Sequence, residues 1–376
     1  MRNEIWDFTL LDTGFFRSGQ PFHAGEGGHS RINSCFPPPM NTLQGAIRST
    51  LAAANGWRPG LNWPEELGDS DCLGSLSLKG PFLITEGKPL FPAPLNLLIK
   101  ELPGTNSEEE PVIDTAFLVP GEKYSCDLGS EVSLPQKKGK LDGARLPKNL
   151  YVTTKGYQAI AKMGKPHKND LYFHDRLWDI EPRIGLKLSA ETRTAKEHNL
   201  YRISHIRPKR GLKVRVIVEG LAADWPKPKH QIVPLGGEGR LAAIEITPTT
   251  DNNCKDMFPS APELTTHNEK IHFTITLITP AYGNKEKLEK LVSKGPAAPG
   301  HCTSASIGKP LFYGGWDLKN QEPRPLRPFL PPGSTWFFEA DQSERKNIER
   351  LHGSQINKEK SAYGYGQILI GIWEVD

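Results

Sequence analysis

Hydrophobic and polar residues alternate along eight short segments of the chain. A period of two residues places alternate side chains on opposite faces of an extended backbone, so it predicts β-strands. β-branched and aromatic residues are frequent in these segments, and glycine and proline separate them. The predicted strands cover residues 4–12, 75–84, 183–191, 212–220, 241–248, 270–280, 334–340 and 367–375.

One segment, residues 43–54, has the period of a helix instead. Its apolar residues recur at intervals of three and four, which predicts an amphipathic helix with one face in the core. Asn41 is placed to cap the N-terminus, with the Gln44 side chain reaching back, and Gly56 is placed to end the helix. Weaker helical patterns cover residues 154–163, 284–293 and 343–352.

Many short strands and few helices predict an α+β protein. The 36 glycines and 33 prolines exceed ordinary usage, so long loops are expected between the elements. The chain has 376 residues and is 37% hydrophobic, which suits two domains with separate cores. We expect exposed loops near residues 103–111, 135–149 and 294–310.

The net charge of +4 conceals two strongly basic segments. Residues 137–168 hold nine Lys and Arg against one acid, Asp142, and residues 183–215 hold ten against Glu191 and Glu197. Such asymmetry focuses a positive field over part of a surface and suits a polyanion such as nucleic acid. A solvated charged face is the other interpretation of each segment, and the sequence leaves both open.

Three glycine clusters, at residues 25–30, 234–240 and 364–371, suggest phosphate binding. A dinucleotide-binding loop lies between a strand and a helix, whereas the second and third clusters run into predicted strands. The P-loop pattern GxxxxGK[ST] does not occur either. Glycines still let backbone amides approach a phosphate closely, and tight turns or bulges are the alternative.

Catalytic and metal-binding motifs are missing from the sequence, which has no HExxH, CxxC or GxSxG. We therefore expect neither a metal nor a cofactor. His23 and His29, beside the first glycine cluster, could act as general acid and base in RNA cleavage. A simple hydrogen-bonding role for both histidines is the alternative.

The five cysteines are scattered and form neither a disulfide framework nor a metal site, so we expect a reducing cytoplasm. No run approaches eighteen apolar residues, and therefore no membrane span is predicted. The start, MRNEIWDFTLLD, lacks the pattern of a signal peptide.

Several segments, taken in order, resemble the RAMP (repeat-associated mysterious protein) superfamily of CRISPR effector subunits. "PF…GEGGHSR…FPPPMNTLQGAIRSTL" resembles its opening, and "EPRIGLKLSAETRTAKEHNLYRISHIRP" resembles its middle hairpin. "PLGGEGR", "LITPAYG", "GGWDLKNQEPRPLRPFLPPGSTWFFE" and "GYGQILIG" follow as in the third subunit of the type III-B Cmr complex. The resemblance covers essentially the whole chain and depends on the order and spacing of the motifs. Residues 99–114 and 294–310 look like lineage-specific insertions.

The resemblance implies two tandem ferredoxin-like (RRM-related) modules with long loop insertions. Residues 1–205 would form the first module, including the basic middle hairpin, and residues 206–376 the second, with the glycine-rich loops. It also implies a non-catalytic, crRNA-binding role in antiviral defence. Such a subunit holds the 5′ handle at the foot of the complex, contacts the large polymerase/cyclase subunit and the backbone RAMP subunits, and meets target RNA indirectly.

Two other functions stay open. One is a metal-independent, crRNA-processing endoribonuclease of the same superfamily, which would use His23 or His29. The other is a scaffold that bridges proteins and makes little contact with RNA.

We expect the RNA contacts in the glycine clusters, the helix at 43–54 and the basic segment 183–215. Arg48 lies about 140° around the helix from Leu43, since successive residues turn by about 100°, and is therefore expected off the core face. There it would meet RNA phosphate or a neighbouring acid. The expected RNA-binding residues are Gly27, Gly28, Arg31, Arg48, Arg183, Arg193, Lys196, Gly236, Gly237, Arg240, Gly364 and Gly366.

Some of these positions have a structural alternative. Arg240 follows a glycine loop and suits either a bidentate phosphate contact or a surface salt bridge. Tyr363 and Tyr365 either stack on bases or pack across a sheet. Trp316 and Trp336 are assigned to the core or to a protein interface.

Overall fold

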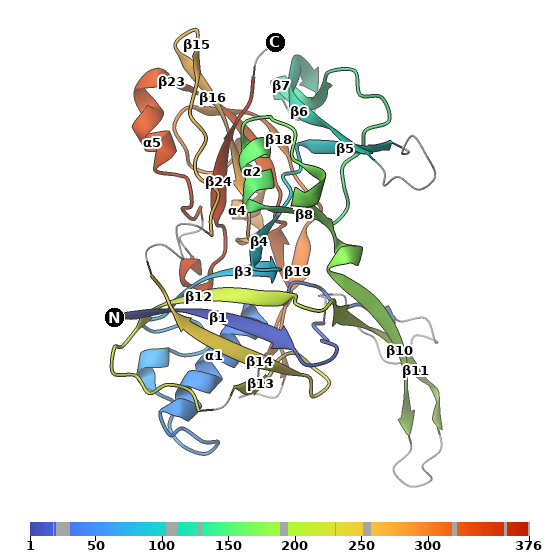
Figure 1. Ribbon diagram of the computed structural model, residues 1–376, viewed down its shortest axis with the longest axis vertical. Helices are drawn as coiled ribbons and strands as arrows, with labels where there is room; N and C mark the ends of the chain where they lie inside the picture. The colour runs from blue at the N-terminus through green and yellow to red at the C-terminus, as the bar shows by residue number, and fades with distance from the viewer. Residues whose placement is uncertain are drawn as a thin grey trace. The chain divides into compact units, whose positions relative to one another are not determined.

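The computed structural model describes residues 1–17, 19, 31–102, 112–126, 129–188, 195–229, 231–250, 257–317, 322–356 and 359–374. The chain divides into two compact units, each built from separate stretches of sequence. Unit 1 comprises residues 1–86, 175–249 and 311–327, and unit 2 comprises residues 87–174, 250–310 and 328–376. Both consist mainly of antiparallel strands with few helices (Figure 1), which confirms the predicted α+β class.

The units differ from the predicted division between residues 205 and 206. That boundary falls inside strand β11 (Ala195–Pro208), which pairs along most of its length with β10 (Trp178–Leu188) in the same unit. The chain leaves unit 1 after residue 86 and returns to it at residue 175. Spatial contacts and not sequence order therefore define each unit. The assignment of ferredoxin-like modules to residues 1–205 and 206–376 stays a prediction.

The main sheet of unit 1 has the strand order β13-β14-β1-β12-β3, and all neighbours are antiparallel. Central strand β1 buries Trp6 and Phe8 almost completely, as its alternating pattern predicts. The strands are β1 (Arg2–Leu10), β3 (Ser77–Thr85), β12 (Lys213–Leu221), β13 (Ile232–Pro234) and β14 (Leu241–Pro248).

Helix α1 (Met40–Ala54) lies along this sheet (Figure 1) and confirms the predicted helix, which begins three residues earlier than expected. The predicted N-cap is wrong. Pro39 is the cap, because its extended backbone ends the proline run directly before the helix. Asn41 lies inside the first turn, and its Nδ2 donates to Gly314 O at 3.0 Å. Gly56 follows the C-cap with φ +83°, as expected of a helix end.

Unit 1 also contains a three-stranded sheet with the order β10-β11-β2. Strands β10 and β11 form a long antiparallel hairpin, and β2 (Arg31–Ile32) adds to β11 in parallel, with Arg31 opposite Arg202. The first glycine cluster therefore leads directly into the edge of the basic hairpin. The remaining elements of unit 1 are η1 (Glu65–Leu67), β19 (Leu311–Tyr313), β20 (Trp316–Asp317) and β21 (Glu322–Pro323).

Unit 2 is built on β16 (Lys270–Leu277). This strand pairs with β23 (Thr335–Asp341) on one side and with β24 (Ile368–Ile372) on the other. Its inner face carries the buried side chains of Phe273 and Ile275, packed with Trp336 of β23, which settles Trp336 as a core residue. The sheet is completed by β15 (Thr266–His267) and β18 (His301–Ser306).

The loop predicted at residues 294–310 is therefore wrong in part. Residues 301–306 form β18 in the core sheet, where Cys302 and Ala305 pack against the buried cluster. The strand has only six residues, and prolines and glycines lie on both sides of it, so the sequence pattern predicted a loop. The loop predicted at 135–149 begins later than expected, since β7 continues to Lys138. The loop at 103–111 lies outside the described residues.

Within the described ranges, unit 2 also contains a three-stranded antiparallel sheet, a run of three antiparallel strands, a short strand pair and three α-helices. The weak helical patterns at 154–163 and 284–293 are confirmed, and the pattern at 343–352 gives only a short helix after a 3-10 turn. None of the helices in the described ranges is long and apolar enough to cross a membrane. The elements are β4 (Lys88–Pro92), β5 (Leu97–Leu102), β6 (Val112–Cys126), β7 (Gly129–Lys138), β8 (Leu150–Thr153), α2 (Thr154–Ala161), β9 (Leu171–Phe173), β17 (Ala281–Tyr282), α4 (Lys285–Lys294), β22 (Arg327–Leu330) and α5 (Arg345–Glu349).

Candidate nucleic-acid interface

Three arginines of unit 1 surround the carboxylate of Asp12. Arg207 Nη1 lies 2.9 Å from Asp12 Oδ1, Arg240 Nη1 lies 3.1 Å from Oδ2, and Arg183 Nη2 lies 3.9 Å from Oδ2. Asp12 follows β1, whereas Arg183 and Arg207 come from β10 and β11, and Arg240 ends the second glycine cluster. The fold thus gathers these charges from three distant parts of the sequence.

Glu181 is the second carboxylate of this group. It accepts from Arg183 Nε at 2.8 Å and from Arg207 Nε at 2.6 Å. Glu181 and Arg183 are two residues apart on β10 and so lie on one face of the hairpin. We call Asp12, Glu181, Arg183, Arg207 and Arg240 the arginine cluster. It carries three positive and two negative charges.

The charges of the cluster support one another. Hydrogen bonds from Arg183 and Arg207 lower the pKa of the Glu181 carboxyl. The backbone N–H of Thr13, followed by Arg207, lowers the pKa of the Asp12 carboxyl. Both acids are therefore ionised at neutral pH. The side chains of the three arginines are between 23% and 46% exposed, so part of each guanidinium is open to a ligand from solvent, whereas Arg240 Nε is buried.

A buried histidine lies directly beneath the cluster. His205 is 1% exposed, its ring stacks on Phe15, and its Nδ1 lies 3.0 Å from Thr13 Oγ1. Arg183 Nη2 donates to the same hydroxyl oxygen at 3.1 Å. The Thr13 hydroxyl has one proton and two lone pairs, so it can donate to His205 Nδ1 or accept from it, according to the tautomer of the ring. Among the described residues, His205 Nε2 is buried and has no hydrogen-bond partner. Burial and then the charges of Arg183 and Arg240 lower the pKa of His205, so the ring is neutral.

The second glycine cluster positions Arg240. Gly236 has φ +85°, and a Cβ there would lie 2.5 Å from Phe15 O. The N–H of Gly237 donates to Phe15 O at 2.9 Å, and the N–H of Arg240 donates to Gly237 O at 3.3 Å. The cluster is therefore a tight turn packed against the loop after β1. Phosphate approach to these glycines stays a prediction.

Arg48 is not where the helical wheel predicts it, because it is buried with only 8% of its surface exposed. Its Nε donates to Leu67 O at 2.8 Å and its Nη2 to Asp69 O at 2.7 Å. The guanidinium also lies 5.4 Å from the centre of the Trp63 ring. The segment after α1 folds back over this face of the helix, which a helix considered alone does not reveal. Arg48 therefore holds α1 to this segment in the described fold.

The third glycine cluster belongs to unit 2 and is also packed. Gly364 and Gly366 are buried with positive φ, and Gly366 N–H donates to Pro280 O at 2.9 Å. The rings of Tyr363 and Tyr365 stack on each other at 6.2 Å and are 5% and 2% exposed. Of the two interpretations, packing within the protein holds for both tyrosines in this structure.

The other predicted residues are placed only in part. Arg31 and Lys196 lie in β2 and β11 of unit 1, but their side chains are outside the description. The same holds for the side chain of Trp316. Five residues lie wholly outside the described ranges, namely Gly27, Gly28, Arg193, His23 and His29.

Sequence reasoning missed Arg207, Asp12 and His205. Arg207 lies within the basic segment 183–215, and strand alternation places it on the same face as His205. That signal was present in the sequence, whereas the approach of Asp12 to both arginines depends on the tertiary fold. Within the described ranges, no group of three or more His, Cys, Asp or Glu residues is arranged to hold a metal ion.

An antiparallel α+β chain with a half-exposed arginine cluster has features typical of nucleic-acid-binding proteins. The model of one protein family, described as CRISPR-associated protein (Cas_Cmr3), matches residues 6–373. The chain therefore belongs to this family and is a Cmr3-type subunit, which confirms the resemblance found in the sequence.

One solved structure shares the fold, and two others are more distantly similar. A chain in the cryo-EM structure of the Type III-B Cmr-beta bound to cognate target RNA is 17% identical with a TM-score of 0.52, covering 97% of this chain and 96% of that one. A chain in the AMPPnP-bound form of the same assembly is 15% identical with a TM-score of 0.47, covering 89% and 86%. A chain in the Csm3–Csm4 subcomplex of the type III-A interference complex is 12% identical with a TM-score of 0.39, covering 100% of both chains. No curated protein matches the chain in sequence.

Proposed function

We propose that this chain is a non-catalytic, crRNA-binding subunit of a type III-B effector complex in the cytoplasm. It holds the 5′ handle of the crRNA and bridges the large polymerase/cyclase subunit to the backbone RAMP subunits. The ferredoxin-like character of its two modules is part of the same proposal. Family membership supports the assembly, and the arginine cluster is the single observation that supports the RNA contact.

The arginine cluster suits a phosphate group. A guanidinium has five N–H donors in a planar fork, and Arg240 contacts Asp12 through Nη1 alone among the contacts described. A phosphate can therefore bind beside Asp12 or replace it, because both are oxygen anions of similar reach.

The buried Thr13–His205 pair favours a structural role over a catalytic one. A hydroxyl hydrogen-bonded to an imidazole is also the arrangement of a nucleophile and its base. Here both residues are 1% exposed, so an RNA phosphate cannot reach the hydroxyl. The pair instead holds Arg183 in place through the Thr13 oxygen.

The proposal is tested by titrating handle-containing RNA against salt. Each lost single-strand phosphate contact should reduce the slope of log K against log salt by roughly 0.7. Arg207→Ala and Arg240→Ala should each show this loss, with folding checked by circular dichroism. Arg58→Ala is the matched control, since Arg58 is exposed in the same unit and makes no contact with the cluster. Equal slopes for all four proteins would reject the interface and favour a scaffold.

The endoribonuclease alternative is tested separately. Repeat RNA incubated with the purified protein in EDTA should stay intact if the subunit only binds. Cleavage that disappears when both His23 and His29 are replaced by Ala would instead establish the metal-independent nuclease.

A further inference from the structure

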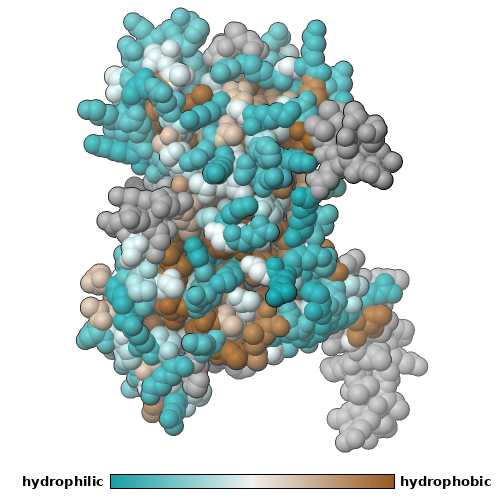
Figure 2. Space-filling view, viewed as in Figure 1, coloured by the Kyte–Doolittle hydropathy of each residue, from teal (hydrophilic) through white to brown (hydrophobic). Residues whose placement is uncertain are grey.

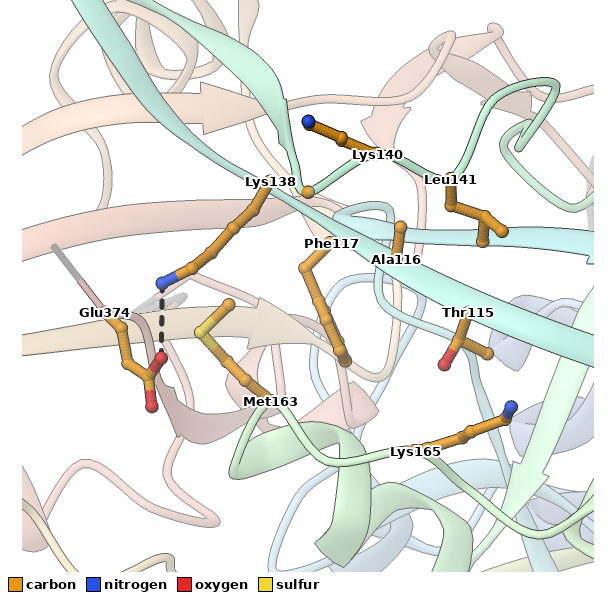
Figure 3. A pocket seen from close by; sticks show the side chains of 10 residues that line it. Thr115, Ala116, Phe117, Lys138, Lys140, Leu141, Met163, Lys165 and Glu374 are labelled. Atoms are coloured by element: carbon orange, nitrogen blue, oxygen red, sulfur yellow. Dashed lines mark hydrogen bonds and ion pairs between the residues drawn. The ribbon is translucent and has the colours of Figure 1, made fainter. Parts of the chain in front are cut away.

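The basic segment 137–168 has no part in the arginine cluster, and part of it lines a pocket of its own. This pocket lies within unit 2 and has a volume of about 330 Å³. Strands β6 and β7, the loop after β7, the turn after α2 and the C-terminal segment form its walls (Figure 3). The lining residues that concern binding are Phe117, Lys138, Lys140, Met163, Lys165 and Glu374.

The floor of the pocket is apolar. Phe117 lies opposite Lys138 in the β6–β7 ladder, so both side chains lie on the same face of this sheet. Figure 3 shows the side chains of Phe117 and Met163 together in the middle of the pocket. Lys138 and Glu374 lie on one side of them, and Lys165 lies on the other.

The rim is basic, and one of its lysines is unpaired. Lys138 pairs with Glu374 at 3.2 Å, and Lys165 pairs with Asp114 at 2.7 Å. The ammonium group of Lys140 is exposed and makes no ion pair within the described part of the chain. The Glu374 carboxylate therefore neutralises Lys138. Lys140 has no such counter-charge among the described residues.

We propose that this pocket binds one nucleotide of a single-stranded RNA. The phosphate binds Lys140 and Lys138, and the base or ribose covers Phe117 and Met163. A nucleotide combines an anion with a flat, weakly polar ring, which matches a basic rim around an apolar floor. The volume is also that of a small-molecule site. The choice of RNA as ligand rests on the proposed function, whereas the site is separate from the arginine cluster.

Glu374 would compete with the phosphate. Its carboxylate lies on Lys138 from a segment that follows the last strand, and 61% of its side chain is exposed. A phosphate that displaces it exchanges one anion for another on the same lysine. Glu374→Gln should therefore tighten RNA binding by about twofold to fivefold, corresponding to the usual strength of an exposed ion pair.

The test uses the full chain and a short oligouridine that contains 4-thiouridine. Ultraviolet crosslinking followed by peptide mapping should identify Phe117, Met163 or their immediate neighbours. Lys140→Ala should lower this crosslink and reduce the salt slope of oligouridine binding by roughly 0.7. Lys148→Ala is the control, because Lys148 is an exposed lysine of the same basic segment that does not line the pocket.

The outcomes separate this site from the arginine cluster. Equal losses for Lys140→Ala and Lys148→Ala, or crosslinks only outside unit 2, would overturn the pocket proposal. Arg240→Ala should weaken handle RNA while leaving the pocket crosslink in place. If Arg240→Ala changes nothing and the pocket crosslink persists, the proposed handle contact fails and the pocket stands. A glutamate-rich peptide that displaces the oligouridine completely and binds more tightly would assign the pocket to a protein partner instead.

Discussion

Arg207 and Asp12 are 195 residues apart in the sequence, yet Arg207 Nη1 donates to Asp12 Oδ1 at 2.9 Å. The bond ties the loop after the first strand of unit 1 to the basic hairpin. Asp12 also accepts from Arg240, so it is the common counter-charge of one arginine on β11 and one in the loop before β14. This carboxylate keeps the guanidinium groups together and occupies the position that we propose for a phosphate.

Asp12→Asn should therefore tighten the binding of handle-containing RNA. The change removes a negative charge from the cluster while the amide oxygen still accepts one hydrogen bond, so a phosphate meets less competition. We expect the salt slope to steepen. The measurement is a binding titration at several salt concentrations. Weaker binding with an intact fold would mean that Asp12 positions the arginines more than it competes with RNA.

Leu51→Asp should unfold unit 1. Leu51 is fully buried on the core face of α1, and an unpaired carboxylate there costs roughly 4 kcal/mol or more. Ala53→Asp is the matched control, because Ala53 is exposed on the same helix. In thermal melts, Leu51→Asp should unfold at a much lower temperature than Ala53→Asp. Similar melts would mean that α1 does not pack as described.

The contrast between α1 and Arg48 indicates what the sequence could predict. The positions of all eight predicted strands and of α1 followed from hydrophobic periodicity, because periodicity reflects which faces are buried. The environment of Arg48 did not follow, because Leu67 and Asp69 cover it from a loop about twenty residues later. β18 was missed for a related reason, since a six-residue strand between prolines and glycines has almost no periodic signal.

The candidate site shows the same division. The basic segment and the glycine cluster predicted Arg183 and Arg240 as RNA-binding residues, and this role stays a prediction. The structure places both arginines beside Asp12. Their meeting depends on the pairing of β1 with β14, which aligns distant strands. No local pattern encodes that register. The resemblance implied two modules that follow one another in the sequence. It did not predict that the two units are each built from several separate stretches.

Arg48→Ala should destabilise the protein without weakening RNA binding by the folded form. The variant removes the donor to the carbonyl of buried Leu67 and to that of exposed Asp69, and the unpaired buried carbonyl costs about 1–3 kcal/mol. Arg48→Lys should recover only part of this loss, since an ammonium cannot span both carbonyls as a planar guanidinium does. Urea denaturation measures the loss of stability, and an RNA titration checks that binding by the folded protein is unchanged. A folded Arg48→Ala protein with weaker RNA binding would restore Arg48 to the interface.

Gly237→Ala should weaken RNA binding without any change of charge. A Cβ at Gly237 would lie 2.9 Å from the Phe15 ring, so the turn that holds Arg240 must shift. Gly239→Ala is the comparison, because a Cβ there meets open space although φ is +62°. That variant should cost only the backbone strain, about 1 kcal/mol in stability. Equal RNA affinities for both variants would show that the position of Arg240 is not important.

The last prediction concerns pH. The folded protein keeps His205 neutral, because burial and the nearby Arg183 and Arg240 lower its pKa below the ordinary 6.5, against a smaller opposing effect of Glu238 and Glu181. The unfolded chain therefore binds more protons than the folded one as the pH falls through 6.5 towards the lowered pKa. This contribution to stability is fully present above that range and is lost on acidification.

His205→Asn should show a smaller loss of stability between about pH 8 and about pH 5 than the wild type. The asparagine amide can accept from Thr13 Oγ1 or donate to it, so the contact with Arg183 is kept while the titrating group is removed. His272 and His352, whose pKa values burial also lowers, contribute equally to both proteins and cancel in the difference. Urea midpoints across this range are the measurement. Parallel pH profiles for the two proteins would mean that folding does not lower the pKa of His205. The neutral ring would then not be needed to hold Thr13 and Arg183 in place.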